Sequence, residues 1–350
     1  MEAAQGPGGV TGGRPGGRPG TGRFAPSPTG PLHVGNLRTA VLAWLFARSA
    51  GAPFLIRIDD LDPAGSRDEH VRSHLADLAA LGIESDGPVV RSSQRFDLYE
   101  STLARLDADG LLYPCYCSRR EVQAAVSAPH GPLPEGAYPG TCRRLTRAER
   151  SDHRAAGRRP AWRVRAGGER VGVVDRLHGR FAGVVDDFVV RRADGAPAYQ
   201  LAVVVDDHEQ GITEVVRGDD LLDTTPRQVW LARRLGLVVP AHAHVPLVLG
   251  PDGGRLAKRH GAVTLADLRA GGVEPPAVLA AMAVSLGLAQ AGSTGAGGGA
   301  ARAGDGGGGG VDAAAGVAMV ADLLPGFDPG RLSREPWRFD PGELASAHSR

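Results

Sequence analysis

The chain has 350 residues, which suggests one large domain or two modest ones. Its 40 basic and 39 acidic residues give a formal net charge of +1, which excludes a histone-like polycation and an acidic-tail protein but not a local basic face for nucleic acid. There is no apolar run long enough to span a membrane and no signal-peptide core near the N-terminus, so we expect no membrane partner. Three cysteines are too few for a disulfide scaffold and favour a cytoplasmic protein.

The chain has 51 glycines and 26 prolines, and the excess is concentrated in two stretches, residues 1–22 and 291–316. Neither stretch can bury enough apolar surface to offset the entropy lost on ordering, so we expect a disordered leader and a flexible linker. A C-terminal appendage, residues 317–350, follows the linker. Its Leu, Phe and Trp residues suggest docking on the main domain, at a place that the sequence leaves open.

A strand, a rigid loop, a helix and a second strand are predicted at the start of the folded part. The first strand ends at Phe24, and a proline-rich loop follows it. From Asn36, apolar residues recur at helical spacing until Gly51, a natural helix stop. Phe54–Ile58 then has the pattern of a buried strand. This order is a βαβ unit, which implies a parallel sheet.

Further elements follow the same α/β pattern. Capping boxes predict two helices, one from Ser66 and Glu69 and one from Thr225 and Gln228. Strand-like runs cover residues 184–192, 212–216 and 246–249, whereas the apolar run 201–205 fits either a strand or a buried helix. Ligands of parallel sheets bind at the carboxyl ends of strands, so the polar clusters after Phe24, Ile58 and Val216 are expected to share one site.

The loop PSPTGPLHVGN, residues 26–36, places His33 and Asn36 at the start of the first helix. Backbone amides and the helix dipole at such a position favour a phosphate. His33 could donate a hydrogen bond to a phosphate oxygen, and Gly35 would let a nucleotide ring approach the backbone. Taken alone, His33 could equally be a simple helix cap.

Lys258 is the only lysine among the 40 basic residues, and it lies in a glycine-rich loop after a strand. The simplest interpretation is a compositional bias that replaced lysine by arginine elsewhere, so that a retained lysine suggests a need for a compact ammonium group. Taken alone, the lysine could also be a chance survivor in a solvated basic loop. On a mobile loop, that group could neutralise charge on a pyrophosphate leaving group.

Together these two segments resemble the HIGH and KMSKS signatures of class I aminoacyl-tRNA synthetases. Asn36 stands where the first signature has a second histidine, and Arg255 and Ala257 replace a lysine and a serine of the second. The resemblance implies an α/β, Rossmann-like catalytic domain formed by residues 23–110 and 166–270, with a helical extension at 271–290. It also implies that ATP, with Mg²⁺, is bound by His33, Gly35, Asn36 and Lys258. Of these four residues, His33, Asn36 and Lys258 are also implied to act in catalysis.

Four further segments resemble the glutamyl group of this family: RFAPSPTG from Arg23, RIDD from Arg57, YQLAVVVDD from Tyr199 and VRGDD from Val216. The resemblance implies glutamate as the amino acid. The two carboxylates of glutamate are best bound by arginine guanidinium groups, and its ammonium group is best bound by a carboxylate. The implied glutamate-binding residues are Arg23, Phe24, Ala25, Pro26, Ser27, Asp59, Tyr199 and Arg217, with Asp59 at a position where relatives usually have glutamate.

The three cysteines, Cys115, Cys117 and Cys142, fall within one short window. Thiolates this close favour tetrahedral Zn²⁺, which needs a fourth ligand, and ligand statistics favour a histidine such as His130 or His153. However, YPGTC, which begins at Tyr138, resembles a subgroup in which a phenolate is the fourth ligand. Residues 111–165 are therefore expected to form a small zinc-binding insertion, the alternative being three buried thiols without a metal.

The chain after Lys258 is too short for the large anticodon-binding domain of a full glutamyl-tRNA synthetase, so we expect none. A truncated synthetase of this kind, with three cysteines and Tyr138, resembles the glutamyl-queuosine tRNA(Asp) synthetase group of paralogues. This implies a monomer that activates glutamate without tRNA and transfers it to the queuosine base at the wobble position of tRNA(Asp). Two alternatives stay open: a shortened synthetase that charges tRNA(Glu), and a non-catalytic, zinc-containing tRNA-binding paralogue.

Overall fold

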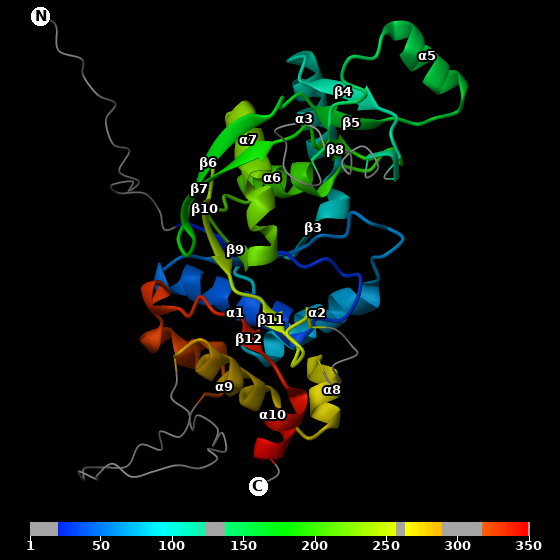
Figure 1. Ribbon diagram of the computed structural model, residues 1–350. Helices are drawn as coiled ribbons and strands as arrows, with labels where there is room; N and C mark the ends of the chain where they lie inside the picture. Colours follow the sequence, from blue (N-terminus) through cyan, green and yellow to red (C-terminus); the bar gives the residue numbers. More distant parts are fainter. Residues whose placement is uncertain (1–19, 119, 123–136, 257–262, 289–316, 349–350) are drawn as a thin grey trace, which may run out of the picture.

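The computed structural model describes residues 20–118, 120–122, 137–256, 263–288 and 317–348, and Figure 1 shows their arrangement. The predicted linker at 291–316 and most of the predicted leader at 1–22 lie outside the described residues, as do Lys258 and His130. Gly22, assigned to the leader, begins the first strand.

A parallel sheet forms the centre of the molecule. Strand β1 (Gly22–Phe24) pairs with β2 (Phe54–Ile58), and β2 pairs with β3 (Val90–Arg91), all in parallel. A parallel bridge from Thr21 to Ile212 joins β1 to β9 (Glu214–Gly218), which pairs in parallel with β10 (Ala241–Val245). The predicted βαβ unit is confirmed, and the carboxyl ends of β1, β2 and β9 meet at one edge.

Helix α1 (Val34–Ser49) connects β1 to β2, and 11 of its 16 residues are buried. It is apolar on nearly all sides because the sheet covers one side and the C-terminal appendage covers another, where Phe46 meets Phe327 edge-on at 5.4 Å. Gly51 follows with φ +65°, a left-handed conformation that glycine adopts without strain, so the predicted helix stop is confirmed.

An antiparallel hairpin extends the sheet beyond β10. Strand β6 (Glu169–Asp175) pairs antiparallel with β7 (Gly179–Val185) and joins β10 through a parallel pair between Asp175 and His242. Helices α6 (Tyr199–Glu209) and α7 (Thr225–Arg234) pack together, and α7 covers the hairpin (Figure 1). The ambiguous run 201–205 is therefore helix, and it is buried throughout.

A separate three-stranded antiparallel sheet contains β4 (Leu112–Cys115), β5 (Ala161–Val164) and β8 (Val189–Arg191). Its last strand lies beyond residue 165, where the insertion was predicted to end. Helix α5 (Arg147–Ala155) has no buried residue and projects from this sheet (Figure 1).

The prediction of one strand over 184–192 is wrong. Between β7 and β8 the chain passes from one sheet to the other through Asp186 and Asp187, whose carboxylates accept hydrogen bonds from Arg227 and Arg143. Both acidic residues are buried, so the ion pairs with these arginines offset the cost of removing their carboxylates from water.

Both predicted capping boxes are also wrong. Helix α2 (Asp68–Ala80) begins after Arg67, and Ser66 makes no cap. Helix α7 follows the short 3-10 helix η2 (Asp219–Thr224), which already satisfies the backbone at its start, so Thr225 and Gln228 are free to make other contacts. Helix α3 (Phe96–Ala108) follows the 3-10 turn η1 (Ser92–Gln94).

The C-terminal part docks beside α1. Strand β11 (Val248–Leu249) pairs in parallel with β12 (Trp337–Arg338), and the amide of Val320 donates to the carbonyl of Leu81 at 2.9 Å. The remaining elements are α8 (Leu265–Ala270), α9 (Pro275–Ser285), η4 (Val320–Gly326), η5 (Pro329–Arg331) and α10 (Pro341–His348). Within the described ranges, no helix is both long and apolar enough to cross a bilayer.

Candidate active site

A cavity of about 720 Å³ opens at the carboxyl ends of β1, β2 and β9. Every predicted glutamate- or ATP-binding residue that the structure describes lines it: Arg23, Phe24, Ala25, Pro26, Ser27, His33, Gly35, Asn36, Asp59, Tyr199 and Arg217. Lys258 lies outside the described residues, but Arg255 and Leu256, which precede its loop, also line the cavity. Segments nearly 200 residues apart in the chain thus share one space because parallel strands end at one edge.

His33 and Asn36 form a reciprocal cap at the start of α1. The Nδ1 atom of His33 accepts a hydrogen bond from the amide of Asn36 at 3.2 Å, and Oδ1 of Asn36 accepts one from the amide of His33 at 3.1 Å. Burial lowers the pKa of His33, so the ring is neutral and its proton resides on Nε2. The cap therefore leaves Nε2–H as a donor at the cavity, and the two interpretations of His33 are compatible.

Gly35 makes room for that cap. A Cβ atom at this position would lie 2.9 Å from Cε1 of His33 and 3.3 Å from Cβ of Val248. Any larger residue would displace the histidine ring from the cavity edge. Close approach of a nucleotide, the reason predicted from the sequence, is a separate requirement that the same glycine could meet.

Arg23 already has an internal counter-charge. Its Nε and Nη2 atoms each lie 3.3 Å from a carboxylate oxygen of Asp207, which also accepts from Nη2 of Arg57 at 2.8 Å. The pKa of Asp207 is held below its ordinary value: burial opposes ionisation, but the two guanidinium groups outweigh it.

Arg217 differs from Arg23 in this respect. Its guanidinium is buried and donates to Nε2 of His244 at 3.0 Å, to Oε1 of Gln228 at 2.8 Å and to Oγ1 of Thr225 at 2.8 Å. These acceptors are uncharged, and no carboxylate in the described part of the chain forms an ion pair with Arg217. Because an uncompensated buried charge is costly, a carboxylate brought to this side of the cavity by a ligand would be stabilised by Arg217.

Asp59 provides an opposite charge at the same cavity. Burial raises its pKa to about 6, with the nearby Asp206 and Asp60 adding to the increase and Arg57 opposing it. The carboxylate is therefore ionised at neutral pH but close to its titration midpoint in mildly acidic solution, and a bound ammonium group would stabilise its anionic form.

The three cysteines converge at the end of β4. Their Sγ atoms lie within 4.8 Å of one another, and those of Cys117 and Cys142 are 3.5 Å apart. Around a tetrahedral Zn²⁺, thiolate sulfurs at about 2.3 Å from the metal are separated by distances of this order. The donor set and its spacing therefore fit zinc.

Tyr138 completes this cluster geometrically. Its Oη atom lies 3.3 Å from Sγ of Cys115 and 3.8 Å from Sγ of Cys117, and it accepts from the amide of Cys142 at 2.7 Å. His153 instead stacks on Tyr116 at 4.7 Å, and no histidine or carboxylate in the described ranges joins the three thiols. Of the two candidate fourth ligands that the structure describes, Tyr138 is the one in position.

Residues 21–294 match the family of class I tRNA synthetases (E and Q), catalytic domain. The chain belongs to this family. A Nocardia farcinica protein named glutamyl-Q tRNA(Asp) synthetase is 54% identical over 318 residues, which cover 91% of this chain and 92% of the relative. A Symbiobacterium thermophilum protein of the same name is 49% identical over 340 residues, covering 94% and 98%.

A solved structure shares this architecture. The chain resembles a glutamate tRNA ligase from Elizabethkingia meningosepticum, crystallised in complex with its amino acid, with a TM-score of 0.74 and 25% identity. The match covers 93% of this chain and 68% of the ligase. The predicted α/β class I synthetase catalytic domain is thus confirmed.

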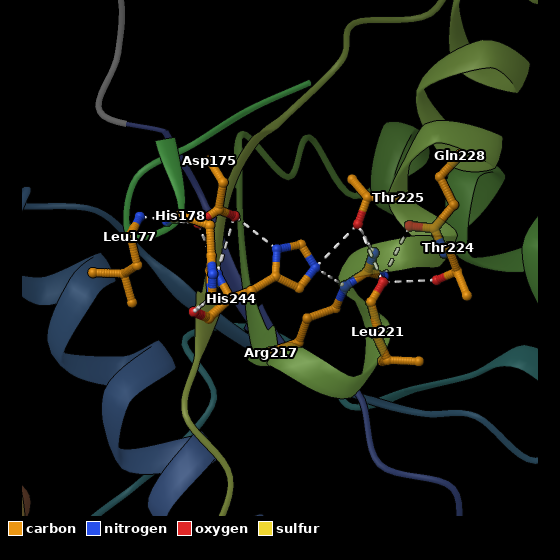
Figure 2. A network of polar contacts seen from close by, with 9 residues as sticks. All are labelled: Asp175, Leu177, His178, Arg217, Leu221, Thr224, Thr225, Gln228 and His244. Carbon is orange, nitrogen blue, oxygen red and sulfur yellow. Dashed lines mark hydrogen bonds and ion pairs between the residues drawn. The ribbon is translucent and has the colours of Figure 1, made fainter. Parts of the chain in front are cut away.

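No sequence motif pointed to the residues that surround Arg217 in this synthetase domain. Figure 2 shows His244 between Asp175 and Arg217, with Thr225 in contact with both the His244 ring and the guanidinium, and with Gln228 at another guanidinium nitrogen. The two alternating histidines of AHAHV in β10 were the available signal for His244. Asp175 gave no signal, since a strand that ends in aspartate is common.

Proposed function

We propose that this chain activates glutamate with ATP and transfers the glutamyl group to the queuosine base of tRNA(Asp). The observation that carries the proposal is Arg217, a buried cation with only neutral partners, on the same cavity as the amino end of α1. The choice of tRNA(Asp) as acceptor is supported by the names of the relatives in Nocardia and Symbiobacterium. The place of the reaction would be the cytoplasm, where ATP and tRNA meet.

In the first step, an oxygen of the glutamate α-carboxylate attacks the α-phosphorus of ATP, and pyrophosphate leaves. Nε2–H of His33 would donate to a phosphate oxygen, Asn36 would hold the helix end that faces the nucleotide, and Lys258 would neutralise the leaving group. Mg²⁺ would accompany ATP as its counter-ion.

Arg217 is assigned to the side-chain carboxylate. The α-carboxylate loses its charge as the anhydride forms, so a strong ion pair to it would stabilise the ground state more than the transition state. The side-chain carboxylate keeps its charge throughout. Asp59 would then bind the ammonium. Tyr199 and Arg23 would add polar side chains to the lining of the glutamate site, and the segment Phe24–Ser27 would line it as well.

In the second step, a hydroxyl of the queuosine cyclopentenediol attacks the carbonyl of the adenylate, and AMP leaves. No enzyme nucleophile is required, because both steps depend on orientation and charge stabilisation. We further propose that Cys115, Cys117, Cys142 and Tyr138 hold one structural Zn²⁺ in the insertion and that the protein acts as a monomer.

Glutamate-dependent ATP–pyrophosphate exchange is expected without any tRNA. Transfer of labelled glutamate is then expected to queuosine-bearing tRNA(Asp) and not to tRNA(Glu) or to tRNA(Asp) that lacks queuosine. Charging of tRNA(Glu) would identify a shortened glutamyl-tRNA synthetase, and absence of both exchange and transfer would support a non-catalytic paralogue.

The KM for glutamate is expected to rise as pH falls through about 6, the pKa of Asp59. Protonation removes the negative charge that would bind the ammonium, so the effect is absent well above this pH and grows below it. Exchange assays between pH 5 and 8 would measure it, with the KM for ATP as internal control. An Asp59→Asn variant should have a high KM at every pH, and a wild-type KM for glutamate that stays flat down to pH 5 would contradict the assignment.

A further inference from the structure

His244 links the buried cation of the site to a carboxylate on another strand. Its Nδ1 atom lies 2.7 Å from Oδ2 of Asp175, and its Nε2 atom lies 3.0 Å from Nε of Arg217 (Figure 2). The side chains of His244 and Asp175 are fully shielded from solvent. Nothing in the two chemical steps uses this pair directly, so its role must lie in what it does to Arg217.

The carboxylate of Asp175 is fixed and ionised. Its Oδ1 atom accepts from the amides of Leu177 at 2.9 Å and His178 at 3.0 Å, and its Oδ2 atom accepts from the amide of His244 at 3.1 Å. Burial alone would favour the protonated form, but these bonds and the one from the His244 ring hold the pKa of Asp175 below its ordinary value.

An ionised carboxylate can only accept, so Nδ1 of His244 must carry the proton that joins them. The neutral ring then presents Nε2 as an acceptor, which is what the Nε–H of Arg217 requires. The opposite tautomer, or a charged ring, would place an N–H group against the N–H of Arg217. Burial lowers the pKa of His244, and the neighbouring Arg217 and His178 lower it further, so the ring stays neutral.

We propose that Asp175 and His244 are positioning residues, which fix the guanidinium of Arg217 for the side-chain carboxylate of glutamate without neutralising its charge. This inference rests on the proposed function and deepens it. A carboxylate in direct contact with Arg217 would compete with the substrate, whereas a neutral imidazole holds the guanidinium and leaves its charge available. Thr225 and Gln228 hold the other two nitrogens in the same way.

Variants of the pair can be tested against a matched control on the same strand. His242 is also buried and stacks on His244 with ring centroids 6.0 Å apart, but it makes no hydrogen bond to Arg217. His244→Phe and His242→Phe remove similar rings from similar surroundings. Asp175→Asn keeps the shape of Asp175 but can donate to Nδ1, which favours the wrong tautomer of His244. His244→Gln can place an amide oxygen near the position of Nε2.

We expect Asp175→Asn and His244→Phe to raise the KM for glutamate by about 10- to 100-fold, the loss typical of one hydrogen bond to a charged group. The KM for ATP should change by less than about twofold, because Arg217 does not face the nucleotide in this assignment. His244→Gln should recover part of the loss, and His242→Phe should leave the KM for glutamate unchanged. Equal rises in both KM values, or the same glutamate defect in His242→Phe, would overturn the inference.

A second measurement is made on the wild-type protein, so its readout does not depend on the kinetics of the variants. Nitrogen-15 NMR of labelled histidines, with the His244 signals assigned by their loss in His244→Gln, should show a neutral ring protonated on Nδ1. A proton on Nε2, or a charged ring at pH 7, would overturn the inference whatever the kinetics. If the wild type shows no glutamate-dependent exchange, the proposed function itself is wrong; if it is active but the variants keep their KM, only the positioning role is wrong.

Discussion

Replacing Arg217 by glutamine is expected to lower kcat/KM for glutamate activation by about 10²- to 10³-fold. Breaking a buried, hydrogen-bonded charge pair costs about 2–5 kcal/mol, and about 1.4 kcal/mol corresponds to a factor of ten. In the proposed assignment the cost would fall on substrate binding, because the charged partner of Arg217 would be the ligand, whereas its side-chain partners are neutral. The loss would be measured by ATP–pyrophosphate exchange at varied glutamate concentration.

Arg38 offers the matched control for this variant. It is equally buried and also has neutral partners, Oγ of Ser285 at 3.0 Å and the carbonyl of Pro246 at 3.0 Å, but it does not line the cavity. Burial lowers the pKa of Arg38 to about 10. Arg38→Gln should alter thermal stability and leave the KM for glutamate unchanged. If Arg217→Gln binds glutamate normally, or if its KM for ATP rises equally, the carboxylate assignment is wrong.

Purified protein is expected to contain about one zinc ion per chain, and Cys142→Ser to contain almost none. Binding of a structural zinc is coupled to folding, so removal of one thiolate should cost the insertion several kcal/mol. Atomic absorption would give the stoichiometry. Limited proteolysis would locate the loosened region, with new cleavage expected around β4 and β5 and not in the β1–β2 region.

The fourth ligand is tested by a pair of variants in the same insertion. Tyr138→Phe removes the oxygen that lies among the sulfurs and is expected to weaken zinc binding by at least about tenfold, as loss of a ligand contact does. His153→Ala removes a ring that stacks on Tyr116 and should leave the stoichiometry at one. Zinc loss in His153→Ala with retention in Tyr138→Phe would reverse the assignment.

Local motifs predicted the members of the cavity better than the contacts between them. Arg23 and Arg217 were predicted as equivalent forks, yet Arg23 is paired with Asp207 and Arg217 is not. Sequence spacing carries no information about which charge across the sheet lies near which arginine, since Arg23 and Asp207 are 184 positions apart. The electrostatic difference between the two residues is a property of the assembled core.

Thr225 and Gln228 illustrate the same limit. Their spacing matches a capping box, and a capping box is a local interaction that a sequence pattern can specify. In the folded chain η2 satisfies the helix start, so the two side chains bind Arg217 instead. The contact with Arg217 is favoured because leaving a buried guanidinium without acceptors costs more free energy than leaving an exposed helix end without a cap.

The sequence by itself determined the βαβ unit, the amino end of α1 with His33, and the grouping of three thiols, because each depends on residues close together in the chain or on a recurrent segment. Only the tertiary structure decided that residues 201–205 form a helix, where the C-terminal appendage docks, and that Asp175 and His244 reach Arg217. Those outcomes depend on which surfaces exclude water from one another, and burial of a charge or a polar group can be judged only after the whole chain has packed around it.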